Sequence, residues 1–389
     1  MNPDFHYYAT YCAAFLAGYT HDECLEIAYS DQLVDLCSET LLRKLKAPTA
    51  AATTQLQLEL MDTRTDIVGL QNITRIWASF HFLPRDLNAE PNRRCSKTYI
   101  NKYRLICGPN GDLLKSTVEL ARGKGPQAVG VAMHILADTW AHRYFAGTPS
   151  LVINNTDSYF SELIADGDGF TERKITFRHS ASAPDEPKNS IYTSSLPVSS
   201  EKSIMNLGHG RAGHLPDYSF IRYKYLPAWG DYEETVKDNP SDYKNAFCQM
   251  IYAMKYLRGS VDTFLTEQYD YAAIADIEEE IDTILMKRQP DASEDWKALG
   301  ERLSGREIAP FDIERYQQEY LLAKEGEADE TFLGRFILAA LAQKSMVTNR
   351  IYRSGSMLAG YSVTYRRDRS LGIKAFRKLI DRKKEGDRE

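Results

Sequence analysis

One nine-residue stretch, from His134 through Asp138 to His142 (HILADTWAH), constrains the fold more than any other, because it spaces three metal-capable side chains four residues apart. In an α-helix each step of four residues advances a side chain by about 40° around the axis and about 6 Å along it, so all three share one face. A row of about 12 Å is too long for one ion and suits two or three cations bridged by the central carboxylate. The alternative is a buried polar network, because a carboxylate also fixes an imidazole tautomer.

The bulk composition is that of an ordinary globular chain of 389 residues. Its net charge of -6 argues against wholesale electrostatic binding to nucleic acid or anionic membrane, but not against a local basic patch. The six cysteines form no C-x-x-C pair and are typical of reduced core residues. The start of the sequence has no secretory pattern, and no apolar run approaches the length of about 18 residues that a membrane span needs. We therefore expect a cytoplasmic protein.

The spacing of apolar residues predicts a mainly α fold. We expect a metal-binding helical domain over 1–239, with an insertion of loops and short strands at 148–206, and a helical C-terminal region over 240–389 packed on it. A capping box from Thr20 to Glu23 is expected to start the second helix. The expected helices are 5–19, 21–45, 113–122, 126–147, 243–264, 269–287, 293–304, 310–324 and 329–347, and the expected strands are 170–177 and 191–193.

The last 25 residues hold ten Arg or Lys against five acids and have an apolar side. Such a basic amphipathic segment either contacts anionic lipid or nucleic acid, or docks on its own protein.

Acidic residues on the second expected helix follow a four-residue spacing, at Asp31, Asp35 and Glu39. Rows of this kind are typical of a solvated helix face. Asp35 differs from the other two because Val34 and Leu36 flank it in the most apolar part of the segment. It is therefore the acid of this row that we single out.

The other candidate ligands lie in two short stretches. His81 stands between two Phe residues and is either a packing residue or a held ligand. His209, His214 and Asp217 fall within nine residues among small side chains, which favours metal ligands on a loop over a plain turn. The residues that follow are aromatic and basic and suit an anionic substrate. The candidates for substrate contact are Arg211, Tyr218, Arg222 and Lys224.

These residues occur in a fixed order: an N-terminal His, an Asp, a His beside aromatics, H-x3-D-x3-H and a late His/Asp cluster. The order resembles the zinc-dependent phospholipase C superfamily, which includes single-strand-specific nucleases of the same fold. The H-x3-D-x3-H spacing is similar to that of the glycosylphosphatidylinositol-specific phospholipase D branch. The Phe-His-Tyr, Phe-His-Phe-Leu-Pro and Gly-His stretches look like an uncharacterised bacterial family of this type. The resemblance covers residues 1–225 and implies a mostly helical fold with three zinc ions at the bottom of a cleft.

Carried over residue by residue, the resemblance implies three metal sites joined through Asp138. The family also uses its mature N-terminal amine as a ligand, whereas His6 here follows five residues, so we expect two or three zinc ions. The first site would use Asp35, His81, His134 and Asp138; the second His6 with Asp138; the third His142 with members of His209, His214 and Asp217.

The function that this resemblance implies is a zinc-dependent phosphodiester hydrolase of the phospholipase C type, in which Asp35 orients or deprotonates the attacking water. Imidazole and carboxylate ligands favour zinc over magnesium. The alternatives are a zinc-dependent nuclease acting on single-stranded nucleic acid, which aromatic stacking would favour, and a non-catalytic helical interaction module with a structural metal.

Overall fold

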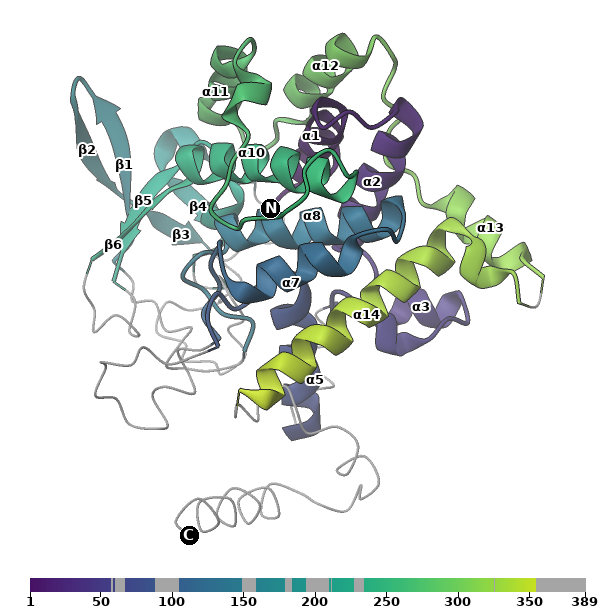
Figure 1. Ribbon diagram of the computed structural model, residues 1–389. Coiled ribbons are helices and arrows are strands. Elements are labelled where there is room, and N and C mark those ends of the chain that lie inside the picture. The colour runs from purple at the N-terminus through teal and green to yellow at the C-terminus, as the bar shows by residue number, and fades with distance from the viewer. Residues whose placement is uncertain are drawn as a thin grey trace.

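The structure, a computed structural model, is a body of packed helices with a small sheet at one side (Figure 1). It describes residues 1–56, 59, 67–87, 105–148, 159–178, 184–193, 210, 212–226, 234–324 and 326–354. The fold is mainly α, as predicted. His209, Arg211 and the basic segment at the C-terminal end lie outside the described residues.

Helix α8 (Pro126–Ala141) lies at the centre of the molecule, and every residue from Gln127 to Ala141 is buried. Gly125 precedes it with φ of 86°, and Pro126 occupies the first turn, where its missing N–H costs no hydrogen bond. The helix was predicted to run to residue 147, but it ends at His142, its C-cap. Helices α2 (His21–Leu33), α7 (Asp112–Ala121), α10 (Asn239–Leu257) and α14 (Phe332–Arg353) surround it (Figure 1).

Helix α2 begins as predicted, with a capping box in which the Thr20 hydroxyl accepts from the Glu23 N–H and the Glu23 carboxylate accepts from the Thr20 N–H. The prediction that this helix continues to residue 45 was wrong. The chain turns after Leu33, and Ser38 caps a separate helix α3 (Glu39–Lys44) by accepting from the N–H of Leu41 at 3.2 Å. Asp35 therefore lies in a turn, not on a helix.

The first predicted helix, 5–19, is also divided. It starts as a π-helix η1 (Asp4–Ala9) and continues as α1 (Thr10–Leu16). The Asp4 carboxylate accepts from the N–H of Phe5 at 2.8 Å and from that of Ala292 at 3.0 Å, which fixes the π-helix against the C-terminal half. Single π turns are frequent at functional sites.

A four-stranded antiparallel sheet of order β2-β1-β5-β6 lies beside the helices, with a two-stranded parallel pair of β3 and β4. The pairing Ser161↔Lys224 joins the predicted insertion to the strand after it. The sequence patterns did not predict β1, β5 and β6, because these short strands have no marked apolar alternation: charged and aromatic residues alternate in β5, and β1 and β6 mix polar and apolar residues. The bounds are β1 Ser161–Asp166, β2 Gly169–Lys174, β3 Thr176–Arg178, β4 Ile191–Thr193, β5 Arg222–Tyr225 and β6 Thr235–Asp238.

The remaining helices pack on the same hydrophobic core as the N-terminal ones, and that core contains residues from both sides of residue 240. A smaller aromatic cluster, which includes Phe145, Phe160 and Tyr225, lies under the sheet. No helix in the described part of the chain has the length and apolar character needed to cross a bilayer. The other bounds are α5 Ile67–Phe80, α11 Glu278–Met286, α12 Ser293–Ser304 and α13 Glu314–Leu322, with 3-10 turns η2 Thr49–Ala51, η3 Pro187–Asn189, η4 Leu215–Asp217, η6 Tyr271–Ile274 and η7 Ala328–Glu330.

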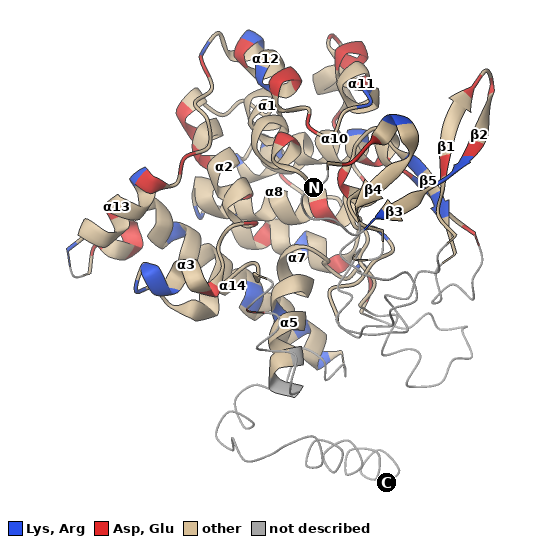
Figure 2. Cartoon of the chain, turned by 180° about the vertical axis from the view of Figure 1, so that it is seen from behind, with Lys and Arg blue, Asp and Glu red and all other residues tan. Residues whose placement is uncertain are grey.

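Basic and acidic residues are interspersed over the outer helices α11, α12 and α13 (Figure 2). Several of them form ion pairs, such as Lys244 with Glu278 at 2.7 Å and Lys287 with Asp295 at 2.7 Å. This mixture of signs gives these helices no face that would attract a polyanion by charge alone.

Helix α2 approaches the backbone of α8 closely at Gly130. A Cβ at this position would lie 2.3 Å from the carbonyl oxygen of Ile27 and 2.8 Å from the backbone nitrogen of Asp31. Because backbone atoms cannot move aside as a flexible side chain can, any larger residue would push the two helices apart.

We predict that Gly130→Ala lowers the free energy of unfolding by about 3 kcal/mol or more, since overpacking a tight core interface has costs of this order. Urea unfolding measures the effect. Gly169→Ala is the matched control, because the nearest atom to its new Cβ would be 3.8 Å away. Equal stability of the two variants would show that the helices are not in close contact at Gly130.

Candidate metal centre

The three residues of the nine-residue stretch meet at one carboxylate. His134 and Asp138 project from α8 on the same face, with His134 Nε2 3.2 Å from Asp138 Oδ2. His142 lies at the C-cap, and its Nδ1 is 3.6 Å from the same oxygen. All three side chains are buried. Helix α8 thus carries two of the candidate ligands, and its C-cap residue is the third.

Four candidate ligand atoms from three segments lie close to one another. They are Asp35 Oδ1 from the turn after α2, His81 Nδ1 from the residue after α5, and His134 Nε2 and Asp138 Oδ2 from α8. Three of the separations, His81 to His134, His81 to Asp138 and His134 to Asp138, are each 3.2 Å. Asp35 lies 3.7 Å from His81 and 3.8 Å from His134. Bonds of about 2.0–2.2 Å to a tetrahedral zinc place its ligands about 3.3–3.6 Å apart. Five of the six separations among the four atoms lie within about 0.2 Å of this range.

The hydrogen bonds behind two of the imidazoles assign their tautomers. His81 Nε2 lies 3.1 Å from the carbonyl oxygen of Thr53, so it carries the proton and leaves the Nδ1 lone pair facing Asp138. His142 Nδ1 donates to the carbonyl oxygen of His81 at 2.7 Å, which turns its Nε2 lone pair toward Asp217 Oδ1 at 3.4 Å. A buried lone pair that faces a carboxylate oxygen requires a proton or a cation between them.

The second oxygen of Asp138 faces another set of groups. Asp138 Oδ1 lies 3.3 Å from His6 Nε2 and 2.9 Å from the amino nitrogen of Met1. His6 is fully buried on the π-helix, and neither of its ring nitrogens makes a hydrogen bond of good geometry among the described residues. The Met1 nitrogen is also 3.4 Å from Asp217 Oδ1. Each oxygen of Asp138 thus faces a different group of nitrogen atoms, as a bridging carboxylate would.

Asp217 is the last residue of η4, and side chains of α10 bind the backbone on both sides of it. Asn239 donates from Nδ2 to the carbonyl oxygens of Leu215 and Tyr218, both at 2.8 Å. The Tyr243 hydroxyl donates to the carbonyl oxygen of Pro216 at 3.1 Å. The backbone on both sides of Asp217 is therefore fixed.

Of the two late histidines, His214 lies within the described residues. Its side chain is half exposed, and its Nδ1 is 3.4 Å from Asp217 Oδ2. The hydrogen bond to Asp217 raises the pKa of His214. His214 thus reaches the outer edge of the cluster, while His209 lies outside the described residues.

The electrostatics of the cluster show an excess of buried carboxylate. Burial alone would lower the pKa of His134, but Asp138 and Asp35 raise it to about 10. Burial would also lower the pKa of the Met1 amino group, but Asp138 and Asp217 raise it to about 11. Burial would raise the pKa of Asp138, yet His142 and the other nearby cationic groups hold it well below the usual range. The cluster therefore demands positive charge, which bound protons or metal cations can supply.

The donor set fits zinc, which binds imidazole nitrogen and carboxylate oxygen. Two groups of three side chains have ligand atoms within 4.8 Å of one another: His6, Asp31 and His134, and Asp35, His81 and His134. The buried ring nitrogens of His6 and the separations around Asp35 supply the structural fit. Sequence analysis missed the role of Asp31, which is fully buried and not on a solvated face.

Two of the predicted substrate contacts, Arg222 and Lys224, are paired with acidic residues of the sheet region. Strand alternation buries Tyr223 and Tyr225 and turns Arg222 and Lys224 to the opposite face of β5. Arg222 pairs there with Asp238 at 2.8 Å, and Lys224 pairs with Glu172 and Glu234. Tyr218 donates its hydroxyl to Asp185 at 2.5 Å. The structure does not bring Arg222 or Lys224 to the cluster, and Arg211 lies outside the described residues.

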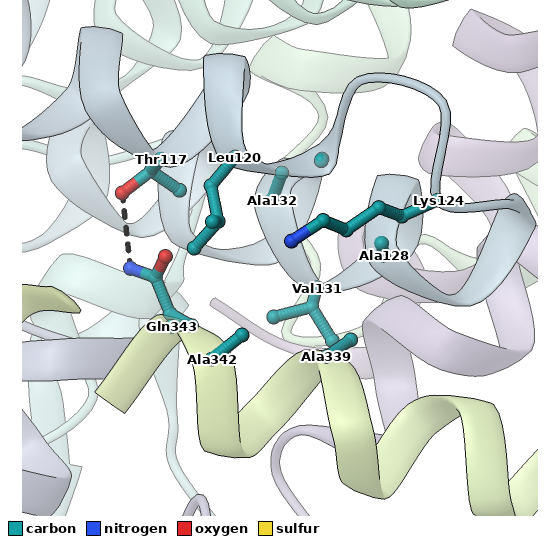
Figure 3. Close-up of a pocket in the computed structure, with 10 residues that line it drawn as sticks. Thr117, Leu120, Lys124, Ala128, Val131, Ala132, Ala339, Ala342 and Gln343 are labelled. Carbon is teal, nitrogen blue, oxygen red and sulfur yellow. Dashed lines mark hydrogen bonds between the residues drawn. The ribbon is translucent and has the colours of Figure 1, made fainter. Parts of the chain in front are cut away.

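A separate pocket between α7, α8 and α14 contains none of the predicted site residues (Figure 3). Its cavity volume of about 20 Å³ is far below the range of about 300–1,000 Å³ of ligand sites. Alanine residues line much of it, and the Lys124 side chain extends across it in Figure 3. Its polar lining consists of Thr117, Lys124 and Gln343, and Gln343 Nε2 donates to the Thr117 hydroxyl at 2.9 Å.

We predict that Asn239→Ala lowers the free energy of unfolding by about 2–4 kcal/mol, because two buried carbonyl groups lose their donor. Chemical denaturation measures the change. Asn245→Ala, on the same helix and more exposed, should stay within about 0.5 kcal/mol of the parent. A small effect at Asn239 would mean that η4 does not depend on it.

Comparison with known proteins gives one match. The model of a family described as a family of unknown function (DUF6765) matches residues 1–351, which include every residue of the cluster. No curated protein and no solved structure matches the chain.

Proposed function

The chain belongs to the DUF6765 family, and we propose that it is a zinc-dependent phosphodiester hydrolase of the phospholipase C type. The observation that carries the proposal is the set of four candidate ligand atoms of Asp35, His81, His134 and Asp138, of which five of the six separations are 3.2–3.8 Å. A second set around His6 and the other oxygen of Asp138 supports more than one ion. Zinc ions bound there would supply Lewis-acid activation and neutralise phosphate charge.

The residues of the chain divide into two roles. The buried imidazoles and Asp138 hold the cations, and Asp35, whose side chain is 30% exposed, is the member of the first set that reaches solvent. A carboxylate at this position can orient a water molecule and accept its proton. Asp35 is therefore our candidate for the general base.

The surroundings of Asp35 favour a substrate with an apolar part. The Thr53 N–H donates to the carbonyl oxygen of Cys37 at 2.9 Å, which joins the turn that holds Asp35 to the segment after η2. Two large apolar side chains are exposed on these segments, Leu36 at 45% and Leu56 at 47%. These two exposed apolar side chains support a phospholipid over a nucleic acid as the substrate.

We predict that the purified protein holds at least two zinc ions per chain and hydrolyses bis(4-nitrophenyl) phosphate. Both properties should be lost on treatment with a chelator and return with added zinc. Asp138→Asn should lower the metal content and reduce the rate by about 10³-fold, as expected for the loss of several kcal/mol of transition-state stabilisation. Elemental analysis and the chromogenic assay measure the two effects.

His134→Ala should behave like Asp138→Asn. His21→Ala is the matched control, because the His21 ring is hydrogen-bonded to the Tyr11 hydroxyl, at 2.7 Å, and is not part of the cluster. Phosphatidylcholine vesicles and a single-stranded oligonucleotide separate the two substrate classes. Activity that survives complete removal of metal would refute the proposal. One zinc ion or none per chain, without activity, would identify a non-catalytic module.

A further inference from the structure

We propose that Asp31 is a positioning residue that orients His6 and His134 from behind, and that it is not itself a metal ligand. The inference rests on the proposed metal centre. The Asp31 carboxylate oxygen and one nitrogen of each imidazole lie within 4.8 Å of one another, so distance alone would also allow Asp31 to be a metal ligand.

The geometry places Asp31 and Asp138 at opposite edges of two stacked imidazoles. The rings of His6 and His134 lie parallel, with centroids 3.8 Å apart and planes at 17°. Asp31 Oδ1 is 2.7 Å from Nδ1 of His6 and 3.0 Å from Nδ1 of His134. At the other edge, Asp138 lies 3.3 Å from Nε2 of His6 and 3.2 Å from Nε2 of His134. Both rings thus present the same nitrogen to the same carboxylate.

The distances at the Asp31 edge are shorter than those between two ligands of one zinc ion. Ligands of one tetrahedral zinc lie about 3.3–3.6 Å apart, whereas an N–H donor and its acceptor lie about 2.7–3.2 Å apart. The separations of 2.7 and 3.0 Å at Asp31 both lie below the first range, and the contact with His134 Nδ1 is a hydrogen bond. One oxygen cannot lie in the planes of two stacked rings at once, so its contact with His6 is bent out of that ring's plane.

Tautomer chemistry gives the same assignment. A neutral imidazole has one N–H and one lone pair, and His134 uses Nε2 in the four-atom set with Asp35, His81 and Asp138. Its proton must then lie on Nδ1, which donates to Asp31. Carboxylates that accept from the far nitrogen of a ligating histidine fix the ring and increase its basicity.

Asp31 is itself held in place. Its side chain is fully buried on α2, and its second oxygen accepts from the Thr10 hydroxyl at 2.7 Å. Thr10 is the first residue of α1, so the contact joins α1 to α2. Asp31 therefore orients His6 and His134 together, and these two residues face different oxygens of Asp138.

The test compares metal count with metal affinity in the full chain. In Asp31→Asn we expect the same number of zinc ions at saturation as in the parent, with affinity reduced about 10- to 100-fold in competition with a chelator. We also expect an altered visible absorption spectrum of the cobalt-substituted protein, because both rings lose their fixed orientation. Asp22→Asn, an exposed change on the same helix, should leave count, affinity and spectrum unaltered.

Loss of one ion at saturation in Asp31→Asn would show that Asp31 is a ligand, and unchanged affinity and spectrum would show that it orients nothing. Either result overturns the inference. If Asp31→Asn fails to fold, Thr10→Val decides: affinity reduced about 2- to 10-fold at full metal count supports the inference, and parental affinity overturns it. A parent protein that binds no zinc would instead refute the proposed function.

Discussion

The rest of the structure depends on the burial of one carboxylate. The side chain of Asp138, on the central helix α8, is 1% exposed, and an isolated charge buried in this way would be prohibitively unfavourable. It is tolerated because nitrogen atoms from five places in the chain surround both its oxygens: the Met1 amino group, His6, His81, His134 and His142. The need to bring these groups to 2.9–3.6 Å from the two oxygens of Asp138 explains why the N-terminal segment, α5 and α8 converge.

The helices that enclose α8 make this arrangement possible. The small side chain at Gly130 lets α2 approach α8 closely enough for Asp31 to reach His134. On the other side, Lys237 donates to the carbonyl oxygen of Trp140 in the last turn of α8 at 2.8 Å, and Asn239 holds the turn that carries Asp217. The C-terminal half therefore supports ligands that lie far before it in the sequence.

Local sequence patterns predicted much of the helical part, because they report local physics. The capping box at Thr20, the Gly-Pro start of α8 and the four-residue spacing of His134, Asp138 and His142 all depend on neighbours within a few positions. The order of the histidines and acids also indicated which residues would meet. The structure brings together His6, Asp35, His81 and Asp217 around α8, at distances that only the folded chain shows.

What the sequence could not show was which surface each residue faces. Asp31 and Asp35 belong to one row of acids, yet a turn after Leu33 separates them, and Asp31 is the more deeply buried. Arg222 and Lys224 looked suited to an anionic substrate, but the alternation of β5 and its pairing with β1 and β6 direct them into ion pairs. Both outcomes depend on long-range packing, which no local pattern contains.

His81 takes part in the cluster through both its side chain and its backbone. Its ring nitrogen faces Asp138, while its backbone carbonyl receives the proton of His142. A shift of this one residue would therefore disturb two imidazoles that face different oxygen atoms. Assembly of the centre should consequently be cooperative: a half-formed cluster has neither the correct tautomers nor the correct spacing, and the pocket forms as a whole or not at all.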